Sequence, residues 1–216
     1  MRTRSHHADR TRGGAVIDLA SRTTVATEDA LRASAYALLA RFLASSPDAS
    51  LLRRTAGVAA DAGTAIGKSL ADLAAACAGT DAATAEREYF DLFLGVARGE
   101  LVPYASYYVT GFLFERPLAR VRADLERLGV ARAADVSEPE DHIAALCETM
   151  SGLASGAFGA VSIEAQRAFF RTHLAGWAPR FFADLESAQA AALYRHVGTF
   201  GRLFLALEQE AFAMAA

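Results

Sequence analysis

Apolar residues recur with a helical period along almost all of this 216-residue chain. Such spacing gathers them on one face of a helix, whereas a half-buried strand would need strict alternation of apolar and polar residues. The pattern is clear in an early segment, Leu31, Ala35, Leu38, Leu39 and Phe42, and in the last, Leu193, Val197, Phe200, Phe204 and Leu207. No internal repeat interrupts residues 27–213. The sequence therefore predicts an all-α fold.

Start and stop signals divide residues 27–216 into a single bundle of about nine helices, preceded by a disordered tail over residues 1–26. Thr27 is expected to cap the first helix, ahead of two acids in its first turn. Residues 100–110 contain β-forming Val and Tyr, yet Pro103 and the lack of a partner strand favour a loop. The other helices are expected near residues 49–60, 66–77, 89–96, 118–129, 139–153, 163–174, 181–185 and 193–207.

Charge and composition exclude several classes of partner. Lys and Arg number 22 against 25 Asp and Glu, so neither nucleic acid nor an anionic membrane surface is indicated. No apolar run approaches the roughly 18 residues that span a bilayer, which predicts no stable membrane insertion. The basic N-terminus lacks the apolar segment of a secretory signal. Cys77 and Cys147 are far apart and without a CxxC motif, so we expect a reducing, cytoplasmic location.

Two neighbouring aromatic segments form the first candidate site. Tyr89, Leu92 and Phe93 make a stripe at helical spacing, and such a stripe is most often core. The following segment, however, places three phenols within five residues, and clustered Tyr on a loop is common at binding surfaces because the ring can be buried while the hydroxyl stays bonded. Both interpretations remain open from the pattern. The members of the second segment are Pro103, Tyr104, Ser106, Tyr107 and Tyr108.

An acidic block, Glu138-Pro139-Glu140-Asp141-His142, is the second candidate. Ser137 and Glu140 have the spacing of a capping box, and acids in a first helical turn need no further function. Alternatively, Asp141 and His142 project into a groove, where a carboxylate pairs with a guanidinium. A metal site is not indicated because no second His follows at helical spacing.

These residues resemble the TorD/DmsD/NarJ family of cytoplasmic chaperones, and most of all its TorD branch. One shared stretch is Tyr89 to Gly95 leading into Pro103 to Tyr108, and another is the Glu-Pro-x-Asp-His block. The third has the form Gln-x-x-Phe-x-x-x-His-Leu-x-x-Trp and consists of Gln166, Phe169, His173, Leu174 and Trp177. The resemblance covers roughly residues 28–212, and the three motifs are specific as an ordered set.

The resemblance implies an all-helical, non-enzymatic chaperone without a cofactor of its own. Members of the family bind the twin-arginine leader of a molybdoenzyme catalytic subunit and delay its export until the cofactor is loaded. The segment from Tyr104 to Arg120 is similar to members that accompany formate dehydrogenases. Here Tyr stands where some relatives have Trp, at positions 89, 104 and 108. The peptide-binding residues expected from the motifs are Tyr36, Tyr89, Leu92, Phe93, Pro103, Tyr104, Ser106, Tyr108, Glu138, Asp141 and His142.

Two other functions stay open at the sequence level. One is a metal-dependent hydrolase that uses Asp141, His142 and His173. The other is an assembly factor of the NarJ kind, whose client is not itself exported. The sequence is compatible with a monomer or with a dimer formed by swapping helices, and it leaves the identity of the client undetermined.

Overall fold

The structure, a computed structural model, describes residues 14–131 and 138–214, with side chains from Thr27 onward. These ranges hold ten α-helices and one short π-helix and contain no named strand, which confirms the all-α prediction. None of the described helices combines the length and apolar character needed to cross a bilayer. The elements are α1 (Gly14–Ala44), α2 (Ala49–Ala56), α3 (Ala65–Ala78), α4 (Ala82–Tyr89), the π-helix η1 (Phe90–Leu94), α5 (Ala105–Thr110), α6 (Arg116–Arg127), α7 (Ile143–Ser155), α8 (Ile163–His173), α9 (Ala178–Ser187) and α10 (Leu193–Met214).

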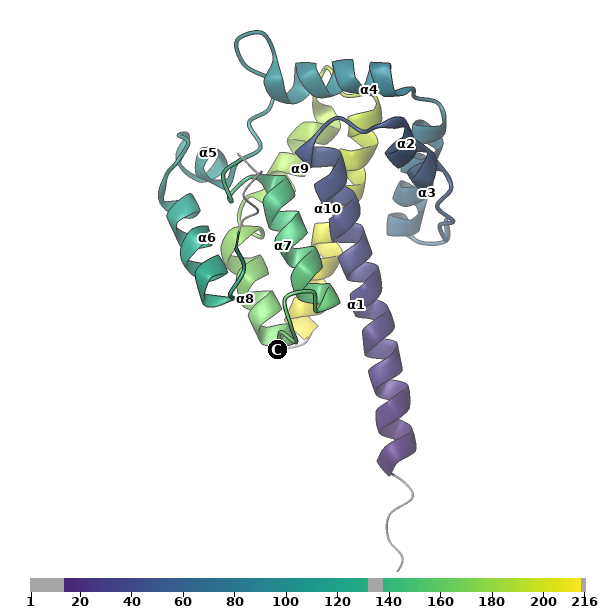
Figure 1. The fold of residues 1–216 in the computed structure, drawn as a ribbon. Helices are drawn as coiled ribbons and strands as arrows, with labels where there is room; N and C mark the ends of the chain where they lie inside the picture. Colours follow the sequence, from purple (N-terminus) through teal and green to yellow (C-terminus); the bar gives the residue numbers. More distant parts are fainter. Residues whose placement is uncertain (1–13, 132–137, 215–216) are drawn as a thin grey trace, which may run out of the picture.

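The long helices α1 and α10 form the centre of the bundle (Figure 1). The most extensive helix pairs are α1 with α7 and α9 with α10, and α3 also packs against α10. Helices α5 and α6 lie at the opposite side of the molecule from α2 and α3, while α4 crosses one end of the bundle (Figure 1). The segment from α4 to α6 is therefore laid over the outside of the central helices.

Glycine permits the close packing of α10 on α9. A Cβ atom at Gly198 would lie 2.6 Å from the backbone nitrogen of Glu186, and one at Gly201 would lie 2.4 Å from the ring of Phe182. Atoms that close cannot coexist, so both positions need a residue without a side chain. The rings of Phe181 and Phe182 are fully buried in the resulting core.

Several helix starts follow the expected capping chemistry. The side chain of Ser162, the predicted cap of α8, accepts a hydrogen bond from the backbone N–H of Ala165. Asp48, Thr64 and Asp81 cap α2, α3 and α4 in the same way, each through an N–H three residues on. A side-chain oxygen at this position satisfies one of the unpaired N–H groups of the first turn.

The start of α1 differs from the prediction. The helix runs from Gly14, so Thr27 lies inside it and is not its N-cap. Residues 1–13 of the expected tail lie outside the described residues, while the backbone of residues 14–26 is part of α1. A residue type that is common at N-caps favours a helix start but does not impose one, so a helix can continue through it.

Two further boundaries were predicted wrongly. Residues 105–110 form α5 instead of continuing the expected loop, since the helix begins after Pro103 and so keeps all its own N–H groups. Helix α7 begins at Ile143 with His142 as its cap, five residues after Ser137, which the capping box predicted as the cap. Ser137, the other half of the expected capping box, lies outside the described residues.

Candidate functional site

The two candidate segments of the sequence meet in the fold. Tyr104 and His142 form an isolated antiparallel bridge, which joins the entry of α5 to the entry of α7. The N–H of Ile143 donates to the carbonyl of Pro103 at 2.9 Å, and the N–H of Ala105 donates to the carbonyl of Asp141 at 3.0 Å. Residues almost forty positions apart are therefore fixed side by side by backbone hydrogen bonds.

The Asp141 carboxylate faces the interior. The residue is 1% exposed, and its Oδ2 accepts a hydrogen bond of 2.9 Å from the backbone N–H of Ser106 in the first turn of α5. Asp141 therefore does not project into an open groove, contrary to the alternative interpretation of the acidic block. A buried carboxylate needs donors, and this one obtains a donor from a helix N-terminus, where negative charge is favoured.

His142 is also buried, at 6% exposure. Its Nδ1 accepts a hydrogen bond of 3.1 Å from the N–H of Ala144, which makes the imidazole the N-cap of α7. Burial lowers the pKa of His142 to about 4, against the opposing effects of Glu138 and Asp141. The ring is therefore neutral at pH 7, as an acceptor at Nδ1 requires.

Tyr104 extends from the bridge between the entries of α5 and α7 to the surface. Its ring meets the His142 ring edge to face at 4.9 Å between centroids, and its hydroxyl donates a hydrogen bond to Oε2 of Glu138. Burial, followed by this bond to Glu138, raises the pKa of Tyr104. Glu138 itself is exposed. A half-buried ring thus ends beside a carboxylate that solvent can reach.

A second group of rings lies at the end of α4. Tyr89, the last residue of α4, packs against Phe93 of η1 at 5.0 Å between ring centroids. Tyr194 of α10 supports both rings from beneath, at 6.1 Å from Tyr89 and 5.5 Å from Phe93. Burial and then the charge of Glu138 raise the pKa of Tyr89 to about 12.

We refer to Tyr89, Phe93, Tyr104, Glu138 and His142 as the aromatic–acid cluster. It consists of the Tyr89–Phe93 ring pair and of Tyr104 with its partners Glu138 and His142, and the charge of Glu138 raises the pKa of both Tyr89 and Tyr104. Leu92 and Pro103, also expected in the site, are buried behind the cluster and serve as packing and as a backbone acceptor. The cluster combines apolar ring surface with one exposed carboxylate. Such a surface suits a ligand that carries both a cation and apolar groups.

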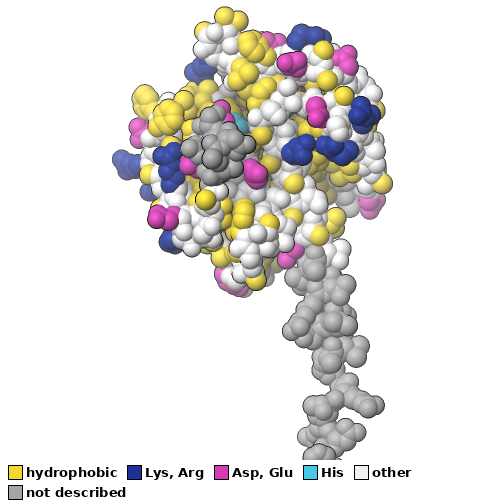
Figure 2. All heavy atoms as spheres, viewed as in Figure 1, with side chains coloured by type: hydrophobic (Ala, Val, Ile, Leu, Met, Phe, Trp, Pro, Cys, Tyr) yellow, Lys and Arg dark blue, Asp and Glu magenta, His cyan; other side chains and the backbone are white. Residues whose placement is uncertain are grey.

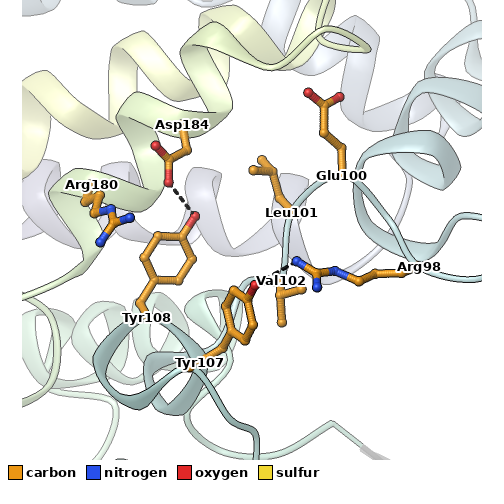
Figure 3. Close-up of a pocket in the computed structure, with 9 residues that line it drawn as sticks. Arg98, Glu100, Leu101, Val102, Tyr107, Tyr108, Arg180 and Asp184 are labelled. Atoms are coloured by element: carbon orange, nitrogen blue, oxygen red, sulfur yellow. Dashed lines mark hydrogen bonds between the residues drawn. The ribbon is translucent and has the colours of Figure 1, made fainter.

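Tyr108 points to the other side of α5. Its hydroxyl donates to Oδ2 of Asp184 at 2.9 Å, and its ring packs against Trp177 at 5.4 Å between centroids. It lines a separate pocket of about 410 Å³ between α5, α9 and the segment before α5 (Figure 3). Arg98 and Arg180 face this pocket as well. Tyr108 is therefore not part of the aromatic–acid cluster.

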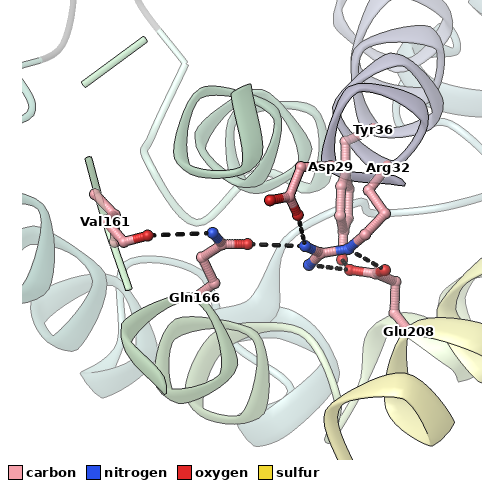
Figure 4. A network of polar contacts seen from close by, with 6 residues as sticks. All are labelled: Asp29, Arg32, Tyr36, Val161, Gln166 and Glu208. Carbon is pink, nitrogen blue, oxygen red and sulfur yellow. Dashed lines mark hydrogen bonds and ion pairs between the residues drawn. The ribbon is translucent and has the colours of Figure 1, made fainter. Parts of the chain in front are cut away.

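Tyr36 lies in the core, away from the cluster. It is fully buried, and its hydroxyl donates to Oε2 of Glu208 at 2.9 Å (Figure 4). Arg32 donates to both oxygens of the same carboxylate, at 2.7 and 2.9 Å, and also to Asp29 and Gln166. This network connects α1 to α8 and α10, so Tyr36 has a structural role. Because the Tyr36 ring is fully buried, a bound peptide could not contact it.

The residues of the hydrolase alternative are not brought together. His173 Nε2 lies 2.6 Å from Oδ2 of Asp124, on the contact between α8 and α6, whereas Asp141 and His142 lie at the start of α7. Burial, with the charges of Arg120 and Arg127, lowers the pKa of His173 to about 4 despite that carboxylate. In the part of the chain that the structure describes, no group of three or more His, Cys, Asp or Glu side chains is arranged to hold a metal ion.

Two residues that support the cluster were missed by the sequence analysis. The ring of Tyr194 packs against the rings of Tyr89 and Phe93, and its hydroxyl donates to the carbonyl of Phe42. Glu88 is buried and accepts hydrogen bonds from three N–H groups at the start of α10, at 2.6 to 3.1 Å. The contacts of both residues join segments about a hundred positions apart in the sequence, so no local sequence pattern could predict these contacts.

Comparison with known proteins agrees with the family resemblance seen in the sequence. Residues 59–183, more than half of the chain, match the family described as nitrate reductase delta subunit. The chain belongs to this family, which includes TorD and NarJ. Among its relatives is the chaperone protein TorD of Vibrio cholerae serotype O1, 32% identical over 131 residues that cover 57% of this chain and 58% of the relative. TorD of Aliivibrio fischeri is 32% identical over 103 residues, or 44% of this chain and 48% of that protein.

The family fold also has a solved example. A crystal structure of a candidate redox enzyme maturation protein from Archaeoglobus fulgidus superposes with a TM-score of 0.56 and 21% identity, over 82% of this chain and 93% of that one. The chain spans about half the length of the curated TorD proteins that it matches. Those relatives are named as chaperones, in agreement with the expected TorD branch and with a role other than catalysis.

Proposed function

We propose that this member of the family is a cytoplasmic chaperone that binds the twin-arginine leader of a molybdoenzyme catalytic subunit and assists cofactor loading before export. Membership of the TorD/NarJ family and the chaperone names of its relatives support the general role. The expected similarity to members that serve formate dehydrogenases stays a prediction about the client.

The observation that carries the proposal is the aromatic–acid cluster. Tyr89, Phe93 and Tyr104 are half-buried rings, and Glu138 beside them is exposed. A twin-arginine leader offers two guanidinium groups followed by an apolar run. A guanidinium stacks on aromatic faces and also pairs with a carboxylate through two parallel hydrogen bonds.

Glu138 is the residue best suited to receive an arginine of the leader. Its carboxylate accepts the hydroxyl of Tyr104 and is exposed, and an exposed carboxylate attracts a guanidinium. Asp141 has a different role in this proposal. Its carboxylate holds the N-terminus of α5 from inside, so it positions Tyr104 and its neighbours without touching the leader.

Calorimetric titration with two leader peptides, one with Arg-Arg and one with Lys-Lys at the same positions, tests this division of roles. Glu138→Gln is expected to weaken binding of the Arg-Arg peptide by roughly fivefold, the scale of an exposed charge pair, and to reduce the preference over Lys-Lys. Asp141→Asn is expected to weaken both peptides equally and to lower the stability of the protein. If Glu138→Gln leaves the discrimination between the peptides unchanged, Glu138 does not contact the arginines.

An assembly factor for a client that is not exported is the second candidate, since the matching family is described as the delta subunit of nitrate reductase. The two functions differ in what part of the client is bound. Co-purification with a molybdoenzyme subunit that lacks its leader, at the same yield as with the leader present, would favour the assembly factor. Loss of the complex with the leader would favour the leader-binding chaperone.

A further inference from the structure

A closed loop carries part of the aromatic–acid cluster. We refer to residues 90–101, from the start of η1, as the η1 loop. The N–H of Leu101 donates to the carbonyl of Leu92 at 2.8 Å, which closes the loop at its base. Phe93 lies within the loop, and Tyr89 directly precedes it. The conformation of the loop therefore decides how these two rings are presented to solvent.

Glycine is required at two positions of the η1 loop. Gly95 has a left-handed backbone conformation with φ at +62°, and a Cβ atom there would lie 2.2 Å from the carbonyl oxygen of Arg98. A Cβ atom at Gly99 would lie 2.4 Å from the carbonyl carbon of Phe93. Only glycine permits such a close approach of two backbone segments. The returning part of the loop thus packs directly against the backbone of Phe93.

Several apolar side chains of the η1 loop do not pack against the core. Val96 is 100% exposed, Leu94 56% and Phe90 41%. Figure 2 shows hydrophobic side chains over the loop that follows α4 at the top of the molecule. Burial of apolar surface, which holds most elements of a fold in place, contributes little at these positions. The placement of the loop therefore depends on contacts at its ends.

Two acids at the ends of the η1 loop connect it to the segment that enters α10. Glu88 is buried and accepts hydrogen bonds from the N–H groups of residues 192–194, at 2.6 to 3.1 Å. Glu100 accepts hydrogen bonds from the N–H groups of residues 189 and 190, at 2.7 and 3.1 Å. The first N–H groups of a helix have no partner within it, and a carboxylate is a favourable acceptor for them. Both ends of the loop are therefore fixed to one segment.

That segment also supports the rings of the cluster. Tyr194, whose N–H is one of the donors to Glu88, packs against Tyr89 at 6.1 Å and against Phe93 at 5.5 Å between ring centroids. Its hydroxyl donates to the carbonyl of Phe42 at 2.8 Å, which fixes the orientation of its ring. A shift of the η1 loop relative to α10 would therefore move both cluster rings away from their support.

We propose that Glu88 and Glu100 are positioning residues of the leader-binding surface. They hold the η1 loop on the entry of α10 and so keep Tyr89 and Phe93 in the arrangement that the leader contacts. This inference rests on the proposed function, because it concerns the same surface. A surface that is already ordered binds more tightly, since less conformational entropy is lost on binding.

Neither acid needs to touch the leader itself. Glu88 is buried beneath the rings, and Glu100 lines the separate pocket of Figure 3. Glu100 is exposed, so its replacement leaves no unpaired group in the core. Glu186 of α9 offers a matched control: it also connects α9 to α10, by accepting from Arg202 at 2.7 Å and from Thr199 at 3.1 Å, but it does not contact the η1 loop.

The test is calorimetric titration of the full chain with a synthetic leader peptide that contains Arg-Arg and an apolar run. Glu100→Ala should weaken binding about fivefold, because the loop must then be ordered when the peptide binds. Glu186→Ala should bind the peptide like the wild type, even where thermal unfolding shows a loss of stability. Hydrogen exchange of the free protein should become faster at residues 90–101 and 189–190 in Glu100→Ala, and should stay unchanged there in Glu186→Ala.

A double-mutant cycle with Phe93→Ala shows whether Glu100 acts through the ring. The loss caused by Glu100→Ala should be smaller in that background, whereas additive losses would overturn the positioning role. Glu88→Gln, which keeps one acceptor oxygen, should weaken binding as Glu100→Ala does, and where it fails to fold the exposed Glu100 decides the outcome. An unchanged affinity of Glu100→Ala would overturn the inference and leave the leader-binding function intact. Failure of the wild type to bind the peptide would reject the function itself.

Discussion

His142 shows how one residue couples protonation to structure. Its Nδ1 caps α7 only while it is unprotonated, and burial lowers its pKa from the ordinary 6.5 to about 4. Between these values the unfolded chain binds the proton and the folded chain does not. The unfolded state therefore binds more protons in this window, and the free energy of unfolding should decrease as the pH falls from about 6.5 to about 4. Urea denaturation at several pH values measures this slope.

The variant His142→Asn isolates the contribution of this residue. Asparagine is a favourable N-cap and does not titrate, so α7 keeps its cap while the proton-binding site is lost. His173 is unchanged and also has a lowered pKa, so part of the slope should remain. A slope equal to that of the wild type would mean that His142 does not carry the pH dependence.

At the scale of elements, the network of Figure 4 fixes α1 against α10. The side chain of Glu208 is 3% exposed and pairs with Arg32 at 2.7 Å. Glu208→Gln removes the more buried of the two carboxylates that pair with Arg32, and the loss of this charged hydrogen-bonded pair should cost on the order of 2 kcal/mol. Chemical denaturation measures the loss. Glu210→Gln, an exposed acid two residues further on, should have little effect.

A second variant separates the unpaired charge from lost packing. Arg32→Met, Tyr36→Phe and Glu208→Leu together replace the polar groups by apolar ones of similar size, and such replacements are often neutral. The triple variant should therefore be more stable than Glu208→Gln alone. If it is equally unstable, the network contributes through its geometry and not through charge compensation.

Most helices could be predicted from the sequence, because their hydrogen bonds and apolar periodicity are local. The exceptions have non-local causes. Helix α5 is short and rich in Tyr and Val, and its first turn is held by Asp141 from another segment. Helix α7 starts at Ile143 because the imidazole of His142 serves as its cap, which the Ser/Glu capping pattern did not indicate. Local patterns therefore identified the elements better than their ends.

The candidate site was predictable to a similar extent. The motifs identified segments that the fold brings together, as the bridge between Tyr104 and His142 shows. They did not indicate which side chains are accessible: Asp141 is buried, while Glu138 is exposed. The exposure of Phe112, between α5 and α6, was not indicated either, because exposure depends on the tertiary neighbours of a residue and apolar residues in a sequence are normally assigned to the core.

At the scale of the whole molecule, the described helices share one core, and the cluster draws on α4, η1, α7 and the segment before α5. A ligand bound across these elements stabilises the folded state as a unit, by about 2.7 kcal/mol at a hundredfold excess over Kd. For a domain of this size the midpoint of thermal unfolding should rise by roughly 5–10 °C. The twin-arginine leader peptide is the ligand with which to measure this rise.

The ionic strength of the solution then tests what holds that ligand. The chain has a net charge of -3 and the proposed ligand is cationic, with Glu138 exposed to solvent at the point of contact. Salt screens exposed charges over about 10 Å at 0.1 M and about 3 Å at 1 M. At a fixed peptide concentration, the rise in the unfolding midpoint should therefore shrink between these two salt concentrations, and it should shrink less in Glu138→Gln. An equal rise at both concentrations in the wild type would mean that apolar contacts alone hold the leader, and the carboxylate at position 138 would then have no part in recognition.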